Sequence, residues 1–446
     1  MGRAGAALAI AAAVVTGGLA VSGGVRADPR TPPAPPGLPA PFLGTAVVGD
    51  GGQTAAVDSF GDVVEVTIGG PAGRALLDVP AARQAAGSVS PVSALVARVE
   101  VGTRRLPLWR ADSIRQRYVA GTNVLRTEAR FGAERATIVR SIGGRAGARA
   151  ERNWVARARG LGAGAPSWAR RMYERSLLVL RALTDRRTGA VAAGAREGWA
   201  YVWPRDASAV ALALASAGYR GEARRVVSFL LGLRLGSAAR FSGSGSAVPG
   251  RPAEGDAAGW VAAAARAAGL PAPHRPFAWR GRPDYQEGEG GDYLGNAVAS
   301  GLSAARIRAL FASGRGLERR AGDPASGLDT AAAWAVRPFA RPRLYPLIRR
   351  SLRGLVARQG RFGILPSENW PDGEPWTAPT AWTAWSLAAL GERRAALRLM
   401  GDLRRASTPT GMFPERVGGR TGLPRSTTPL AWSHAFAILA LRQLWP

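Results

Sequence analysis

The hydrophobic pattern of the chain changes once, near residue 150, and this change limits the folds that it can form. Before it, short β-prone runs such as 63–68 are bounded by glycine-rich turns, a pattern typical of an antiparallel β-sandwich. After it, apolar residues recur at helical spacing in the segments 168–183, 206–217, 221–233, 256–268, 293–312, 328–339, 342–357, 379–390, 395–406 and 432–444. So many helices favour a closed α/α toroid over a four-helix bundle, and the lack of a fixed-period consensus argues against a regular solenoid.

The first residues predict export. Arg3 precedes a weakly apolar run at 4–21, and Val25-Arg26-Ala27 fits the small-x-small rule for signal peptidase. We therefore expect a signal peptide at 1–27, a proline-rich linker at 28–41, a β-sandwich domain at 42–150 and a helical domain at 151–446. The mature protein would be secreted or held in the cell envelope without membrane insertion, since the run is marginal for a membrane anchor.

The composition excludes several kinds of site. The chain has 446 residues, no cysteine and two histidines, so disulfides, thiolate metal sites and a histidine-rich zinc site are ruled out. A carboxylate calcium site stays open, although no spacing demands one. We expect no cofactor.

The net charge of +29 raises the question of a nucleic-acid partner. All 60 basic residues are arginine, however, and they are spread along the chain with no basic tail and no nucleic-acid-binding signature. We expect solvated arginines and no nucleic-acid partner. An arginine-rich structural protein, held in the cell envelope by anionic polymers, remains an alternative.

One aromatic cluster surrounds an arginine next to an aspartate, in Trp199-Ala200-Tyr201-Val202-Trp203-Pro204-Arg205-Asp206. A guanidinium offers fixed donors and a carboxylate accepts, so the two can hold a polyol in one orientation. Aromatic faces, here those of Trp199, Tyr201 and Trp203, stack on the C–H faces of pyranose rings. The alternative is a buried structural ion pair at a helix start.

A second motif lies near the C-terminus, where Phe413-Pro414-Glu415 ends an apolar stretch and Trp432-Ser433-His434-Ala435 follows. Glu415 is a candidate catalytic carboxylate, with a surface pair to Arg416 as the alternative. Trp432 is a candidate sugar platform. We expect His434 to be a hydrogen-bonding residue at a helix start rather than a catalytic base.

These motifs, in this order, resemble glycoside hydrolase family 15, the glucoamylase-like enzymes. The resemblance also includes Asp-Ser-Phe-Gly-Asp at 58–62, Tyr-Val-Ala-Gly-Thr-Asn-Val-Leu-Arg-Thr at 118–127 and Ser-Leu-Leu-Val-Leu-Arg-Ala-Leu at 176–183. It implies a β-sandwich followed by an (α/α)6 barrel, and an inverting exo-α-glucosidase. Arg205 and Asp206 would grip the terminal sugar, and Glu415 would be the general base. Arg416 stands where the family often has glutamine.

The same resemblance places the general acid in the stretch 283–294, where Glu287 matches best. Gln286 replaces the family's usual aromatic residue, which removes apolar cover from the acid. Glu289 is the rival, and a solvated acidic loop is the alternative to both. Glu368 has suitable chemistry but comes too late in the family order. Asp256 and Trp260 match another substrate-side helix.

We therefore expect a monomeric, exported hydrolase that releases glucose from the non-reducing end of α-glucans or oligosaccharides. The linkage that it cleaves is left open. A non-catalytic carbohydrate-binding protein on the same scaffold is the alternative, because the surroundings of the acid depart from the family pattern. Further tryptophans could be sugar platforms, although each is individually better explained by packing: Trp279, Trp370 and Trp376.

Overall fold

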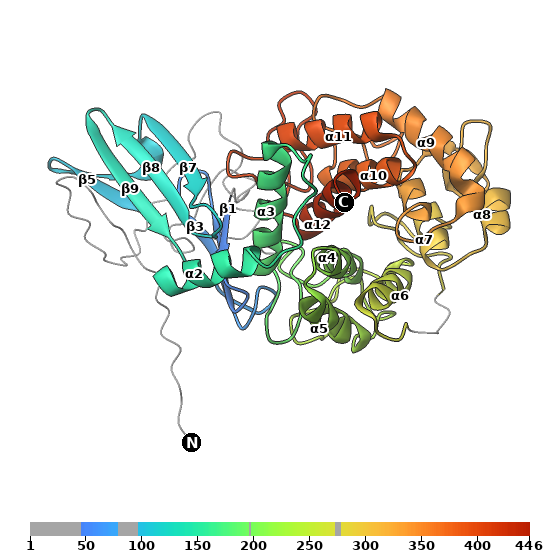
Figure 1. Ribbon diagram of the computed structural model, residues 1–446, viewed down its shortest axis with the longest axis horizontal. Helices are drawn as coiled ribbons and strands as arrows, with labels where there is room; N and C mark the ends of the chain where they lie inside the picture. The colour runs from blue at the N-terminus through green and yellow to red at the C-terminus, as the bar shows by residue number, and fades with distance from the viewer. Residues whose placement is uncertain (1–45, 79–96, 196–197, 273–277) are drawn as a thin grey trace, which may run out of the picture.

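The computed structural model describes residues 46–78, 97–195, 198–272 and 278–446. Strands fill the first part of the chain and helices the rest, in two adjoining parts of the molecule (Figure 1). The expected signal peptide at 1–27 and linker at 28–41 lie outside the described residues.

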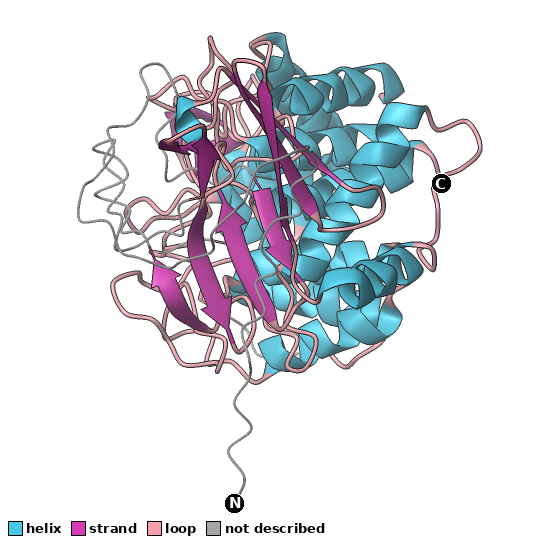
Figure 2. Cartoon of the chain, turned by 90° about the vertical axis from the view of Figure 1, so that its left-hand side faces the viewer, coloured by secondary structure: helices cyan, strands magenta, loops and turns pink. Residues whose placement is uncertain are grey.

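The N-terminal part contains antiparallel sheets. A four-stranded sheet runs in chain order through β1 (Ala46–Gly49), β2 (Gln53–Val57), β3 (Val63–Ile68) and β4 (Arg74–Asp78). A three-stranded sheet contains β7 (Ser113–Tyr118), β8 (Leu125–Phe131) and β9 (Glu134–Arg140). The strands β5 (Arg98–Val101) and β6 (Arg104–Pro107) form a separate hairpin. Figure 2 shows these strands on one side of the molecule with the helices behind them.

Strands β1 to β3 of the four-stranded sheet are buried on both faces, and alternation along β1 explains how. Ala46 and Val48 pack in one cluster with Leu125 of β8, so this face lies against the three-stranded sheet. Val47, on the opposite face, belongs to the main core with the helices. Side chains that alternate across a strand thus join the sandwich to the helical part.

The helical part has an inner layer of almost fully buried helices. The clearest are α4 (Pro204–Ser216), α10 (Thr377–Ala389) and α12 (Ala431–Leu444). Helix α12 contacts both α4 and α10, α4 also contacts α6 (Ala257–Ala268), and α12 also contacts α3 (Ser167–Ala182). A helix that is apolar all round is one buried between other elements. The amphipathic helices α5 (Arg220–Leu231), α9 (Tyr345–Ala357) and α11 (Arg393–Ala406) pack outside them.

Some boundaries differ from the sequence prediction. The expected helix at 293–312 is two helices, α7 (Leu294–Ala299) and α8 (Ala304–Phe311), because Gly301 adopts a positive φ between them. The expected helix at 328–339 is the end of strand β11 (Asp323–Leu328), which pairs with β10 (Glu318–Arg320), followed by the short 3-10 helix η2 (Thr330–Ala335). Residue 150 falls inside α2 (Gly144–Val155), which the sequence did not predict.

The described residues also contain two other short 3-10 helices, η1 (Leu108–Arg110) and η3 (Pro342–Leu344). Within the described part of the chain, no helix is both long and apolar enough to cross a membrane.

Candidate active site

The candidate site lies where the N-terminal ends of several inner helices meet. Arg205, in the first turn of α4, ion-pairs with Asp256, which immediately precedes α6, and its guanidinium lies 4.7 Å from the ring centroid of Trp432 in α12. At the start of α10, Thr377 contacts Ser433 of α12, with 2.8 Å between the two hydroxyl oxygens. Helix N-termini carry a partial positive charge, which favours carboxylates at this end of the barrel.

Arg205 is enclosed by three carboxylates. It pairs with Glu254, lies 3.2 Å from Asp256 and lies 3.6 Å from Asp206, and its own side chain is 3% exposed. Burial opposes the charge on Arg205, but Glu254, Asp256 and Asp206 together raise its pKa above the usual value. The expected pairing of Arg205 and Asp206 is therefore part of a larger buried cluster, in which Trp432 covers the guanidinium.

One cation cannot neutralise three buried carboxylates. Burial raises the pKa of Glu254 to about 8, with Arg205 opposing the shift. Burial also raises the pKa of Asp206 to about 7, and the negative charge of Glu415 adds to the shift. Near neutral pH the cluster therefore retains protons, and these can be donated in hydrogen bonds.

Glu415 lies beside the start of α10, where its backbone and one hydroxyl hold it in place. Its N–H donates to the carbonyl of Thr427 at 2.9 Å, and its carbonyl accepts from the N–H of Thr377 at 3.0 Å. The hydroxyl of Ser426 donates to Oε2 of the carboxylate. Because one carboxylate oxygen is fixed in this way, the other can be directed at a bound molecule.

Arg416 does not pair with Glu415, which excludes the surface pair that the sequence left open. Its guanidinium instead lies 3.2 Å from Asp372 and 3.0 Å from Glu374. The adjacent side chains of Glu415 and Arg416 thus have separate partners, and Arg416 belongs to an ion-pair network on the surface.

Glu287 lies in the loop before α7 and faces Trp203. The indole Nε1–H of Trp203 donates to Oε1 of Glu287 at 2.9 Å, and Arg251 forms an ion pair with the other oxygen. The φ of Glu287 is 55°, one of two positive values among non-glycine residues in the described part of the chain. A backbone conformation of this kind costs about 1–3 kcal/mol and occurs most often at functional sites.

The loop that carries Glu287 is anchored by a buried polar network. The hydroxyl of Tyr285 lies 2.9 Å from Asp329, and the Gln286 amide donates to Asp329 at 3.3 Å. Arg319 lies 3.0 Å from Asp284. Gln286, which replaces the family's aromatic residue, therefore makes polar contacts behind Glu287 rather than covering it.

The two other acid candidates lie in different surroundings. Glu289 is exposed, and its carbonyl accepts a hydrogen bond from Tyr293 at 2.7 Å. The carboxylate of Glu368 is paired with Arg315 and Arg358. Burial and these partners act in opposite directions on Glu368, and the net effect lowers its pKa. The structure brings Glu287, but neither Glu289 nor Glu368, next to Trp203.

His434 is a structural residue, as predicted. It is fully buried, Nδ1 lies 3.0 Å from the hydroxyl of Ser176, and Nε2 accepts the backbone N–H of Phe413 at 3.1 Å. Burial lowers the pKa of His434 well below its usual value. The imidazole is therefore neutral and fixes the backbone two residues before Glu415.

The aromatic candidates divide into two groups. Trp199 and Tyr201 are half-buried beside Trp203, and backbone hydrogen bonds from Ala193 and Gly194 hold them in place. Trp260 packs edge-on against Trp334 in the core and is therefore no sugar platform. The remaining tryptophans make ring contacts, Trp279 with Phe311 and Trp370 with Trp376.

Sequence reasoning missed the roles of two residues. Glu254, two residues before Asp256, is a direct partner of Arg205. Arg251 is the partner of Glu287, and nothing in the surrounding loop sequence distinguishes it from the other arginines among the 60 basic residues. The neighbouring Gly250, with its positive φ, signals a turn but gives no direction for the side chain.

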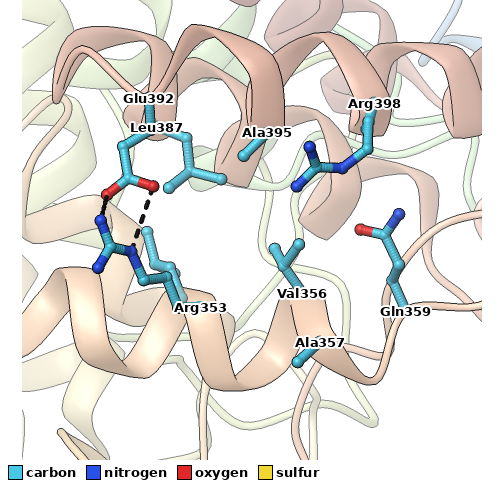
Figure 3. A pocket seen from close by; sticks show the side chains of 9 residues that line it. Arg353, Val356, Ala357, Gln359, Leu387, Glu392, Ala395 and Arg398 are labelled. Carbon is cyan, nitrogen blue, oxygen red and sulfur yellow. Dashed lines mark hydrogen bonds and ion pairs between the residues drawn. The ribbon is translucent and has the colours of Figure 1, made fainter.

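Two sizeable cavities lie elsewhere. One, of about 390 Å³, lies between α9 and α11, where Arg353 pairs with Glu392 (Figure 3). Another, of about 720 Å³, is lined by β7 and by Trp109. Neither is lined by a candidate site residue. Across the described ranges, no group of three or more histidine or acidic side chains is arranged to hold a metal ion.

Comparison with known proteins connects this site to a family. Residues 167–233, from α3 to the end of α5, match the family model of glycosyl hydrolases family 15. A search of curated protein sequences finds no match.

Several solved structures share the fold. A wild-type glycosidase is 20% identical, with a TM-score of 0.52 over 63% of this chain and 99% of its own. A bacterial glucoamylase complexed with acarbose is 15% identical, with a TM-score of 0.54 over 70% of this chain and 63% of its own. The glucoamylase from Saccharomycopsis fibuligera is 12% identical, with a TM-score of 0.51 over 64% and 97%. The family 15 model thus matches the segment that contains Arg205 and Asp206, and the solved structures show that this chain shares the glucoamylase fold.

Proposed function

We propose that this protein is an exported, inverting exo-α-glucosidase that releases glucose from the non-reducing end of an α-linked glucan or oligosaccharide. One relationship carries the proposal: Glu287 contacts the residue that precedes α4, and Glu415 is near enough for its charge to act on the first turn of that helix. Glu287 is bonded to Trp203 at 2.9 Å, and the charge of Glu415 acts on Asp206. Inversion needs two such groups on opposite faces of the sugar ring.

In this proposal, Glu287 donates its proton to the glycosidic oxygen while Glu415 accepts a proton from water. The oxygen of that water forms a bond to the anomeric carbon as the bond to the leaving sugar breaks, and β-glucose results. Exchange of protons with solvent restores both carboxyl groups. The hydroxyl of Ser426 holds one oxygen of Glu415, which leaves the other for the water.

The cluster around Arg205 would form the floor of the glucose subsite. Oδ2 of Asp206 is buried and makes no hydrogen bond in the described structure. A buried acceptor without a donor is unfavourable by about 1–3 kcal/mol, so a sugar hydroxyl that donates to it would gain binding energy. Because Arg205 and Asp206 are almost fully buried, this contact requires the covering side chains, including Trp432, to shift.

One observation favours a second candidate, carbohydrate binding without hydrolysis. The ion pair with Arg251 favours the ionised form of Glu287, whereas a general acid must carry a proton. If Glu287 is never protonated, the protein would bind a sugar between the same aromatic residues and leave the glycosidic bond of that sugar intact.

Glucose release from maltooligosaccharides, isomaltose and trehalose separates the two candidates. We expect Glu287→Gln and Glu415→Gln each to lower kcat by about 10²–10⁴-fold, the usual contribution of a general acid or base. Glu289→Gln is the matched control, because that side chain is exposed on the same loop, and it should retain wild-type activity. If the wild-type protein binds these sugars and releases no glucose, the enzyme proposal is wrong and the binding function stands.

A further inference from the structure

Two arginines lie on the aromatic side of the site, and neither transfers a proton in the proposed reaction. The guanidinium of Arg240 lies 4.9 Å from the ring centroid of Tyr201 and 5.7 Å from that of Trp203. The guanidinium of Arg251 lies 5.9 Å from the same Trp203 ring. Both cations are therefore next to the residue that donates to Glu287.

Their loop, between α5 and α6, fixes the two side chains near each other. The N–H of Ala239 donates to the carbonyl of Arg251 at 3.2 Å, and the N–H of Val248 donates to the carbonyl of Arg240 at 3.0 Å. Phe241 pairs with Val202 through two backbone hydrogen bonds of 2.7 and 2.8 Å. The arginines are thus carried by a backbone that is bonded directly to the aromatic segment.

The positive charge at this position is only partly balanced. Arg240 donates to the carbonyl of Gly198 at 3.2 Å, and no described carboxylate is within ion-pair distance of it. Arg251 has one such partner among the described residues, Glu287. Burial and the neighbouring charge of Arg240 lower the pKa of Arg251, and the charges of Glu415 and Glu254 oppose this shift without cancelling it.

Catalysis increases this imbalance. When Glu287 carries the proton that the reaction needs, it no longer offers Arg251 a negative charge. In that state neither guanidinium has an ion-pair partner among the residues that the structure describes, and an anionic ligand beside these low-polarity aromatic rings would be bound strongly.

The exposure of the side chains places Arg251 on the leaving-group side, and Arg240 lies beside the same Trp203 ring. Exposure rises from 3% for Arg205 to 29% for Glu287 and 38% for Arg251. A general acid must touch the glycosidic oxygen, so the sugar that leaves lies on the solvent side of Glu287. Arg251 is in contact with Glu287 on that side.

We propose that Arg240 and Arg251 bind a carboxylate or a phosphate carried by the leaving group, and that this protein prefers substrates with an anionic leaving group over neutral ones. The inference rests on the proposed function, since it assigns the substrate class of the same site. Arg251 would exchange Glu287 for the anionic group of the substrate, which frees Glu287 to be protonated.

The test compares three glucosides that share the non-reducing glucose. Maltitol has a neutral leaving group, maltobionate has a carboxylate and maltose 1-phosphate has a phosphate. We expect kcat/KM of the wild-type protein to be at least about tenfold higher for one or both anionic substrates than for maltitol, equivalent to ~1.4 kcal/mol. The anion that is preferred identifies the chemical group. Raising NaCl from 20 to 500 mM should reduce the preference, because salt screens the attraction.

Variants connect the preference to the arginines. Arg240→Gln should bring the ratio of anionic to neutral kcat/KM close to one, chiefly through KM, and Arg240→Lys should restore part of it. Arg398→Gln removes the same charge from an exposed position on α11 at the distant cavity, and should leave the ratio unchanged (Figure 3). Equal kcat/KM for all three substrates in the wild-type protein, or a ratio that Arg240→Gln does not alter, would overturn the inference while the proposed function stands.

If none of the three is cleaved, and the wild-type protein also releases no glucose from maltooligosaccharides, isomaltose and trehalose, the proposed function fails instead. The inference is then judged by calorimetric binding of the same ligands. Tighter binding of maltobionate or maltose 1-phosphate than of maltitol, lost in Arg240→Gln, would support the anionic subsite. Equal affinities would overturn it.

Discussion

The indole N–H of Trp203 donates a 2.9 Å hydrogen bond to Oε1 of Glu287, and this bond joins two segments separated by 84 positions in the sequence. Trp203 is the residue immediately before α4, whose first turn contains Arg205 and Asp206. The sugar-binding motif and the candidate acid are therefore fixed relative to each other.

Trp203→Phe tests that bond, because phenylalanine retains an aromatic ring and removes the donor. A hydrogen bond to a carboxylate favours its ionised form. We expect kcat to fall about tenfold as Glu287 loses its orientation, and the basic limb of the pH–rate profile to move to higher pH as ionisation becomes less favourable. A lower maximal rate with an unchanged basic limb of the pH–rate profile would mean that the indole N–H only supports packing.

Ser426→Ala tests how the candidate base is held. The serine hydroxyl donates to Oε2 of Glu415, and its loss lets the carboxylate rotate away from the water. A reduction of kcat by about tenfold with little change in KM is expected, since a hydrogen bond to a charged group contributes ~1.5–3 kcal/mol. Ser407→Ala, which removes a hydroxyl bonded to the carbonyl of Arg404, is the control and should be fully active. Equal activity of the two variants would show that the hydroxyl of Ser426 is not needed to orient Glu415.

The buried cluster makes stability depend on pH through Glu254. Its pKa is raised from 4.5 to about 8, so between these values the folded protein holds a proton that the unfolded chain has released. The stabilising contribution is complete below about pH 4.5 and is lost as the pH rises through 8. Glu254→Gln should flatten this dependence.

Urea unfolding at several pH values between 5 and 8 measures the effect. The free energy of unfolding of the wild-type protein should fall over this range more steeply than that of Glu254→Gln. The two proteins are compared by the slope of the free energy of unfolding against pH, because the variant also loses its ion pair with Arg205 and so differs in absolute stability. Equal slopes for the two proteins would show that Glu254 is ionised in the folded protein.

His434→Ala should destabilise the fold without any catalytic role for the imidazole. The change leaves the buried N–H of Phe413 and the hydroxyl of Ser176 without a partner and opens a cavity. We expect the free energy of unfolding to fall by about 3 kcal/mol, from the cost of unsatisfied buried groups. At low temperature, where the His434→Ala variant is folded, it should keep a measurable fraction of the wild-type kcat. A loss of kcat comparable to that of Glu415→Gln would indicate that the imidazole takes part directly in the reaction.

The sequence predicted the order of sheets and helices because both depend on local periodicity. The spacing of apolar residues in 379–390 and 432–444 anticipated α10 and α12 to within two residues. It was less accurate at 328–339, where pairing with β10 keeps Leu328 in a strand and the helix that follows is the short 3-10 helix η2 at Thr330–Ala335. Tertiary pairing outweighs local propensity at such positions.

The candidate site was predictable only where its residues form a local motif. Arg205 with Asp206, and Glu415 after a proline, are recognisable in the sequence. The contacts of Glu254 with Arg205 and of Arg251 with Glu287 span 49 and 36 positions, and one sequence contains no signal for such pairs. They arise because the barrel brings separate helix starts to one end.

The stereochemistry of the first product tests the central claim most directly. Proton NMR during the first minutes of hydrolysis distinguishes the two anomers of released glucose before they equilibrate. If Glu287 and Glu415 act as acid and base on opposite faces of the ring, an α-linked substrate should yield β-glucose first. Initial release of α-glucose would mean retention through a covalent intermediate and would contradict the account.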